Sequence, residues 1–129
     1  MREIKFRIWC KQNETMKTVS KIGFDEGKLW YVEDEDHETQ PPYFEDDDDW
    51  VLMQYTGLKD KNGKEIFEGD IVTGKGIQGV IKWIPEHCGF LIHEEIGYTF
   101  INAGNAPETN YEIIGNIYEN PELLGGAGE

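Results

Sequence analysis

The chain has 129 residues, with 12 Lys and Arg against 26 Asp and Glu, giving a net charge of −14. This length predicts one compact unit, or two small β subdomains that share a core. No apolar run approaches the roughly 20 residues needed to span a bilayer, and the N-terminus lacks the apolar stretch of a secretory signal. We therefore expect a cytoplasmic protein with no membrane partner, in which Cys10 and Cys88 stay reduced.

Charge is segregated along the chain. The segment from Glu33 to Asp49 is strongly acidic and contains no Lys or Arg. The first 22 residues show the opposite balance, with only Glu3 and Glu14 set against Arg2, Lys5, Arg7, Lys11, Lys17 and Lys21. Repulsion from nucleic acid therefore need not hold for every surface of the molecule.

The N-terminal part reads as antiparallel β-structure. Ile4, Phe6 and Ile8 alternate with polar residues, which predicts a half-buried strand over residues 2–9. A partner strand is predicted from Met16 to Val19. Further on, Asp25-Glu26-Gly27-Lys28 separates two apolar runs, as expected for a hairpin turn.

The acidic segment, residues 33–49, predicts a mobile loop, because it has few groups to bury and its like charges repel. Tyr43 and Phe44 interrupt it and are expected to tether it to the body of the protein. Strand character resumes from Trp50 to Tyr55.

Turn chemistry dominates the middle of the chain. Asn62-Gly63 suits the positive φ angles of a type I′ turn, and Glu68-Gly69-Asp70 predicts a second turn that leads into a strand. The Gly-rich segment 73–79 does not match a phosphate-binding loop, since no Ser or Thr follows Lys75 and a strand comes next. We expect a flexible hairpin tip there.

Four later strands are predicted, over residues 80–84, 89–93, 98–101 and 111–118. With the strand after Asp70 they make five short strands with Gly-rich turns, a pattern typical of an SH3-like small barrel. The predicted fold is mainly β, with N-terminal antiparallel strands packed on a C-terminal SH3-like small barrel. The expected division is an N-terminal β portion at 1–57, a barrel at 58–118 and a tail at 119–129, within one compact unit overall.

No catalytic, cofactor or metal constellation is predicted. His87, Cys88 and His93 lack a fourth zinc ligand unless Cys10 or Glu94 supplies one. Glu65, Glu68 and Asp70 lie at turns, where carboxylates usually cap backbone N–H groups. Asp46 to Asp49 lacks the ligand spacing of a calcium loop. We expect no enzyme activity, no cofactor, no metal and no small-molecule substrate.

Aromatic residues beside cations suggest a nucleic-acid contact, because such rings stack on unpaired bases. One candidate group is Trp9 with Arg2, Lys5 and Arg7. The other is Trp83 with Lys75 and Lys82. The alternative is that these rings belong to the core, as they more often do in a small β protein.

Three segments carry a family resemblance. They are residues 52–72, from Leu52-Met53-Gln54-Tyr55-Thr56-Gly57-Leu58 to Glu68-Gly69-Asp70-Ile71-Val72, the opening Met1 to Trp9, and the closing Tyr111 to Leu124. Together they resemble the YopX-like family of phage and prophage proteins. Asn62, Gly63, Glu68, Gly69 and Asp70 form the turn signature of the first segment.

The resemblance implies an SH3-type barrel, a homo-oligomer and a family without an established enzyme activity. We therefore expect a non-enzymatic phage or prophage accessory protein that acts by binding or self-assembly. Two alternatives stay open: a weak binder of single-stranded nucleic acid, and an acidic decoy for a host DNA-binding protein. The expected partner is accordingly a second copy, a nucleic acid, or a host or phage protein.

Overall fold

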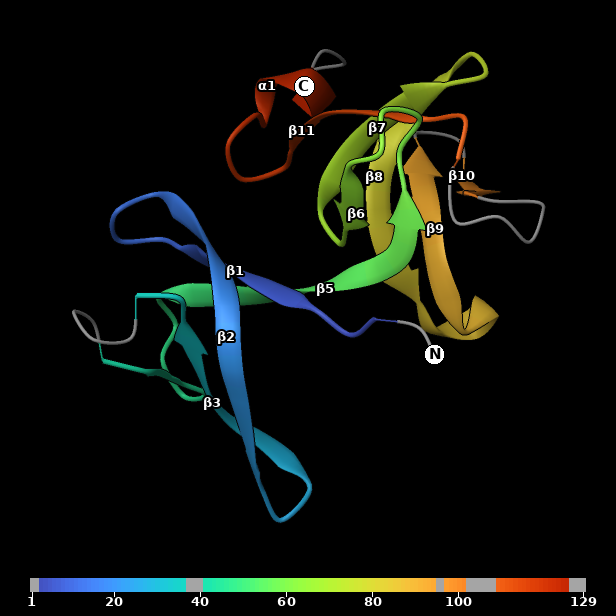
Figure 1. Ribbon diagram of the computed structural model, residues 1–129. Coiled ribbons are helices and arrows are strands. Elements are labelled where there is room, and N and C mark those ends of the chain that lie inside the picture. The colour runs from blue at the N-terminus through green and yellow to red at the C-terminus, as the bar shows by residue number, and fades with distance from the viewer. Residues whose placement is uncertain (1–2, 37–40, 95–96, 102–108, 126–129) are drawn as a thin grey trace. The chain divides into compact units, whose positions relative to one another are not determined.

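The computed structural model describes residues 3–36, 41–94, 97–101 and 109–125 (Figure 1). The chain divides into two compact units: an N-terminal unit of residues 5–54, and a C-terminal unit of residues 1–4 and 55–129. Almost all regular structure is antiparallel β-strand, which confirms the predicted mainly β class. The SH3-like closure of a barrel stays a prediction.

The N-terminal unit is one antiparallel sheet. Its strands are β1 (Phe6–Cys10), β2 (Thr15–Asp25), β3 (Lys28–Asp34), β4 (Tyr43–Phe44) and the first half of β5 (Trp50–Lys59). Their order is β4-β3-β2-β1-β5. The core forms around Ile8, Cys10 and Val32. The predicted apolar face is confirmed at Ile8, which is fully buried, but Ile4 precedes β1 and is 67% exposed, so its predicted inward position was wrong.

The predicted hairpin turn at Asp25 to Lys28 is confirmed. Asp25 and Lys28 pair across it, and both central residues have positive φ, 52° for Glu26 and 82° for Gly27. These are the angles of a type I′ turn, whose twist matches that of the flanking strands. The two strands are longer than predicted, because β-bulges at Ser20 and Trp30 let pairing continue through irregular positions.

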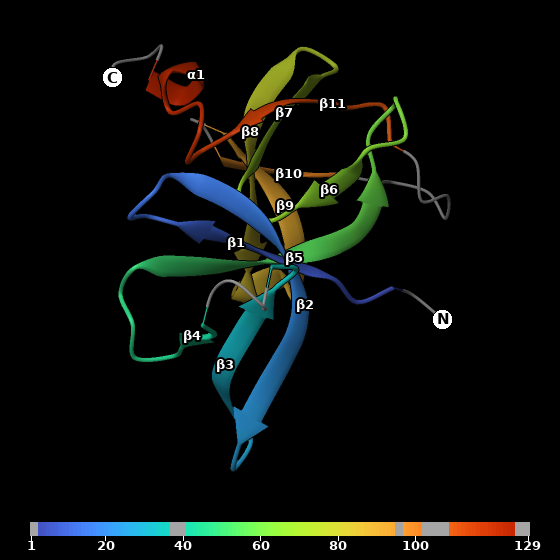
Figure 2. The ribbon, with the colours of Figure 1, turned by 60° about the vertical axis from the view of Figure 1, so that its left-hand side comes forward.

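The acidic segment does not form one mobile loop. β3 continues through Glu33 and Asp34, and Tyr43 and Phe44 form β4, which pairs with β3 (Figure 2). The loop prediction was therefore wrong at these positions, while the predicted tether at Tyr43 and Phe44 is confirmed. The physical reason is that the Asp34 carboxylate has partners inside the sheet, so its charge does not exclude it from a buried position on a strand. Residues 37–40 lie outside the described part of the chain.

The C-terminal unit contains a second antiparallel sheet of five strands. They are β7 (Asp70–Gly74), β8 (Ile77–Ile84), β9 (Gly89–Glu94), β10 (Gly97–Phe100) and β11 (Glu112–Asn116), in the order β10-β9-β8-β7-β11. β6 (Glu65–Phe67) pairs with β5. A 3-10 turn at Pro85–His87 and a short helix α1 (Glu122–Gly125) complete the unit. Each strand predicted between residues 80 and 118 is present, with its ends shifted by a few residues.

The core of this unit is mostly aliphatic, with one tyrosine. Its fully or almost fully buried members are Ile66, Val72, Ile81, Ile92, Ile101 and Tyr111. Ile81 and Ile92 are direct cross-strand partners, so their side chains share one face of the sheet.

Two turns differ from their predicted form. At Asn62-Gly63 only Gly63 has a positive φ, 87°, so the turn is not type I′. The predicted loop over 73–79 is only the two-residue turn Lys75-Gly76, with φ of 52° and 80°, since Gly74 and Ile77 already pair. The glycines on either side are strand residues. Gly79 is required because a Cβ there would clash with the His93 carbonyl oxygen.

Candidate binding surfaces

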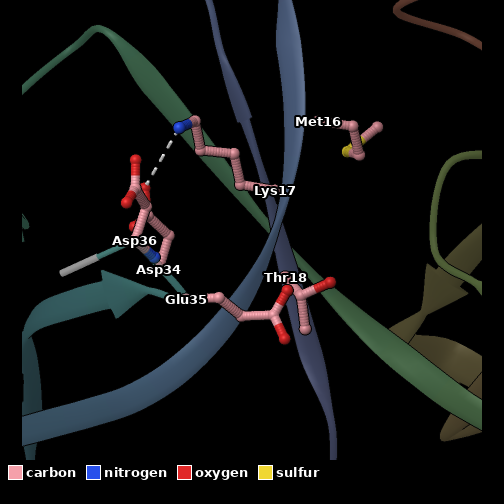
Figure 3. A pocket seen from close by; sticks show the side chains of 6 residues that line it. All are labelled: Met16, Lys17, Thr18, Asp34, Glu35 and Asp36. Atoms are coloured by element: carbon pink, nitrogen blue, oxygen red, sulfur yellow. Dashed lines mark hydrogen bonds and ion pairs between the residues drawn. The ribbon is translucent and has the colours of Figure 1, made fainter. Parts of the chain in front are cut away.

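A small polar pocket opens on the N-terminal unit (Figure 3). It has a volume of about 240 Å³ and is lined by Met16, Lys17, Thr18, Asp34, Glu35 and Asp36. Lys17 and Asp34 face each other across it, with 3.7 Å between Nζ and Oδ2. β2 and β3 position this pair, since Lys17 lies on β2 and Asp34 ends β3.

Asp34 is the centre of a buried hydrogen-bond network. The residue is only 2% exposed, and its carboxylate accepts hydrogen bonds from the Tyr43 hydroxyl (3.1 Å) and from the backbone N–H of Asp36 (2.7 Å). The Cys10 thiol in turn donates to the Tyr43 oxygen at 3.2 Å. The network therefore joins β1, β2, β3 and β4.

The state of Tyr43 follows from this environment. Burial raises the pKa of its hydroxyl, and the hydrogen bonds to Cys10 and Asp34 raise it further. Tyr43 thus stays protonated and keeps donating to Asp34. Because Asp34 has its partners inside the protein, we interpret the pocket as structural. Among the described residues, no group of three or more His, Cys, Asp or Glu side chains is placed to hold a metal ion.

The exposed ring of Trp30 and the half-buried ring of Phe44 mark a surface near the β2–β3 hairpin. Trp30 is 49% exposed, and its ring lies edge-on to Phe44 with 5.5 Å between centroids. The next residues, Glu45 to Asp49, are all exposed. Glu45 is held against the hairpin, since its N–H donates to the Trp30 carbonyl at 2.9 Å. Rings and carboxylates therefore adjoin within one unit.

A second set of exposed rings lies on β10 in the C-terminal unit. Tyr98 is 52% exposed and Phe100 is 68% exposed. Being two positions apart on a strand, they share one face of the sheet. Each is close to a histidine, with ring centroids 5.0 Å apart for His93 and Tyr98 and 6.4 Å apart for His87 and Phe100. Among the described strands, β10 is at the edge of its sheet.

The predicted nucleic-acid residues fall in different units. Arg2 lies outside the described residues. Lys5 and Arg7 are half-buried in the N-terminal unit, and Trp9 is only 7% exposed.

Lys75 and Lys82 belong to the C-terminal unit. The Lys75 ammonium lies 5.7 Å from the centre of the Tyr111 ring, while Lys82 is exposed beside Trp83, which is 47% exposed. As consecutive residues of β8, Lys82 and Trp83 point to opposite faces of the sheet.

Asp70 and Gly69 of the turn signature form hydrogen bonds with backbone groups. The Asp70 carboxylate accepts a hydrogen bond from the Phe67 N–H at 2.7 Å. Gly69 has a φ of 90°, donates its N–H to Ile81 and accepts from Ile117. Glu68 and Gly69 are the two residues between β6 and β7. These contacts agree with a structural role for the Gly-Asp turn.

Asp60 is the residue that the sequence did not single out. It is fully buried, and Oδ1 accepts from the N–H groups of Asn62 and Lys64, both at 2.9 Å. Oδ2 accepts from the N–H of Ile113 at 3.1 Å. Burial alone raises the pKa of Asp60, but these three hydrogen bonds outweigh it and hold the pKa below its usual value. The available signal was an Asp just before Asn-Gly, where its side chain bonds the backbone two residues on.

These features define a two-sheet, mainly β protein whose exposed aromatic surfaces are its candidate binding sites. The YopX protein family model matches residues 5–125, and the chain belongs to that family. It is similar to the crystal structure of protein EF1440 from Enterococcus faecalis, with a TM-score of 0.64, 28% identity, and coverage of 96% of this chain and 99% of that one.

It is also similar in fold to the crystal structure of protein yopX from Bacillus subtilis. That TM-score is 0.60 at 22% identity, with coverage of 93% of this chain and 97% of that one. No curated protein matches the sequence. Within the described residues, no helix has the length and apolar character required to cross a bilayer.

Proposed function

We propose that the chain is a non-enzymatic accessory protein of a phage or prophage, acting by binding and, first of all, by self-assembly. The observation that carries this proposal is the pair of exposed rings on β10, Tyr98 and Phe100. Aromatic rings dominate the energetics of protein interfaces, and large exposed ones on a strand are a cost unless a partner covers them.

The position of these rings at a sheet edge favours a second protein chain as the partner. An edge strand presents backbone N–H and C=O groups that another strand can pair with. The aromatic side chains would then add cross-strand contacts to the backbone hydrogen bonds. A closed, symmetric oligomer would remove both the exposed rings and the open edge.

Light scattering coupled to gel filtration tests this proposal. Wild-type protein should have a mass above the 14.9 kDa of one chain. Phe100→Lys places a charge on the edge and should shift the mass toward one chain, because edge lysines block strand pairing. The matched control is Phe24→Lys, since Phe24 is 64% exposed but lies in the N-terminal unit. A wild-type protein that is monomeric throughout would contradict self-assembly.

A second candidate function is the acidic decoy, in which carboxylates stand in for nucleic-acid phosphates. It is favoured by the run Glu45 to Asp49, whose side chains are all exposed. A decoy should release duplex DNA from a basic DNA-binding protein, measured as a fall in polarisation of labelled DNA. Replacing Asp46 and Asp48 by Asn should weaken that release, and an unchanged effect would rule out this role.

A further inference from the structure

We infer that the Trp30 and Phe44 rings, together with the carboxylates of Glu45 to Asp49, form a docking surface for an arginine-rich segment of a partner protein. We call these residues the ring-and-acid surface. The inference rests on the proposed binding function and names the chemistry of a partner other than a second copy.

A β-bulge places Trp30 on the surface of the N-terminal unit. Gly23 pairs with Tyr31 and Phe24 pairs with Leu29, so Trp30 is the extra residue on β3. A bulge redirects the side chain of the residue it inserts. Here the indole is left 49% exposed instead of joining the core, and Phe44 supports it edge-on at 5.5 Å. An exposed, supported indole is a suitable face for a cation.

Backbone hydrogen bonds then place the carboxylates beside the ring. The Glu45 N–H donates to the Trp30 carbonyl, and the Asp47 N–H donates to the Phe44 carbonyl at 2.9 Å. At the far end, the Lys11 N–H donates to the Asp49 carbonyl at 2.7 Å. The acidic run is therefore anchored at both ends, and its exposed residues follow directly after Phe44 in the chain.

The run Glu45 to Asp49 holds five carboxylates and no cation. The Lys21 ammonium lies 3.7 Å from the Glu33 carboxylate, and Lys11, whose N–H donates to the Asp49 carbonyl, adds one positive charge at the end of the run. Five adjacent carboxylates, Glu45 to Asp49, thus face solvent next to the rings. The surface is complementary to a positively charged partner and unfavourable for nucleic acid.

Arginine fits this pairing of groups better than lysine. A guanidinium is planar, stacks on aromatic faces and binds carboxylates through two parallel hydrogen bonds. Lysine offers only a compact, strongly hydrated charge. An arginine-rich segment can therefore use the ring and the carboxylates together.

Fluorescence polarisation with a labelled oligo-arginine peptide and the full chain tests the inference, with oligo-lysine of equal length as comparison. Wild-type protein should bind oligo-arginine more tightly than oligo-lysine, and salt should weaken both. Trp30→Leu keeps an apolar side chain but removes the ring, and should weaken oligo-arginine binding about two- to fivefold. The double variant Asp46→Asn/Asp48→Asn should weaken binding of both peptides.

Matched controls lie in the C-terminal unit. Trp83→Leu removes a similarly exposed indole, and Glu86→Gln/Glu122→Gln removes two exposed charges. Both should leave peptide binding unchanged. Equal weakening by the controls, no effect of Trp30→Leu, or tighter binding of a single-stranded oligonucleotide than of oligo-arginine would each overturn the inference. The oligomeric mass of the same variants is measured as a separate test of self-assembly. A failure of this inference can then be distinguished from a failure of the proposed self-assembly.

Discussion

Asp60 shows how much one buried carboxylate contributes to the C-terminal unit. Its two oxygens hold the 60–64 turn on one side and the start of β11 on the other. The sequence predicted a turn here from Asn62-Gly63, but it assigned the wrong type. The hydrogen bond from Ile113 joins residues 53 positions apart, so no local sequence pattern indicates it. Pattern reasoning detects neighbours in sequence, so this part of the structure could not be predicted.

Asp60→Asn should lower the free energy of unfolding by about 1–3 kcal/mol, because an amide cannot replace a charged acceptor of three N–H groups. Denaturant melts measure the loss. Asp25→Asn, at an exposed turn position, should stay within about 0.5 kcal/mol of wild type. Equal stability of both variants would contradict the role given to Asp60.

The same change predicts an effect on acid stability. The pKa of Asp60 is lower in the folded than in the unfolded chain, so its contribution is present above the unfolded value of about 3.9 and is lost as the pH falls through the folded pKa. Asp60→Asn should therefore differ least from wild type at the lowest pH. A stability difference between variant and wild type that stays constant in melts from neutral to strongly acid pH would contradict the lowered pKa of Asp60.

At the scale of the element, β4 shows that part of the acidic segment belongs to the sheet of the N-terminal unit. Composition predicted a loop without structure, yet Tyr43 packs against the core of the N-terminal unit and bonds both Cys10 and Asp34. A two-residue strand is too short to give a periodic signal, and the satisfied carboxylate of Asp34 cannot be recognised without its partners. Tyr43 and Phe44 were visible in the sequence only as aromatic interruptions of an acidic run.

Deletion of Glu33 to Asp49, rejoined by a short Gly-Ser linker, should destroy the cooperative unfolding of the N-terminal unit. The composition of the segment suggested the opposite, but the deletion removes β4, the end of β3 and the Asp34 network. Thermal melts followed by circular dichroism measure this. The matched variant, with Asp46 to Asp49 changed to Asn, keeps these elements and should still unfold cooperatively.

Tyr43→Phe should lower stability at neutral pH by about 0.5–1.5 kcal/mol through loss of the hydroxyl hydrogen bonds. Because the pKa of Tyr43 is raised by folding, its contribution is full below the unfolded pKa of about 10 and falls as the pH rises above that value. Wild type and variant should thus converge in alkali. The variant should still lose some stability at alkaline pH, since burial and Glu94 also raise the pKa of Tyr111.

At the scale of the whole molecule, the strand pattern was the most predictable feature. Alternation identified β1, and a pattern of short strands with Gly-rich turns identified the strands of the second sheet. Gly-containing pairs identified the turns at Glu26-Gly27 and Gly69-Asp70. The binding surfaces were less predictable. Trp30, Tyr98 and Phe100 look like core residues in sequence, and only the bulge and the edge position of β10 show that they are exposed.

Binding to single-stranded oligonucleotides should be weak or absent, since a net charge of −14 repels a polyanion. Trp9 is largely buried, which leaves little ring surface for a base to stack on. Polarisation at low ionic strength measures this. Tight binding that the Lys5→Glu/Arg7→Glu variant abolishes would establish the N-terminal strand as a nucleic-acid contact and contradict the expectation.

β5 also has a genetic consequence. Its residues Trp50 to Gln54 pair with β1, while Tyr55 and Lys59 pair with β6, so the boundary between the units falls inside a strand. A recombination joint at this boundary would supply the two halves of β5 from different parents. Each half would still pair with a strand from its own parent, since β1 precedes the joint and β6 follows it. Exchange between related genes should therefore be tolerated better at a joint here than in the β2–β3 hairpin turn, where it would pair β2 of one parent with β3 of the other.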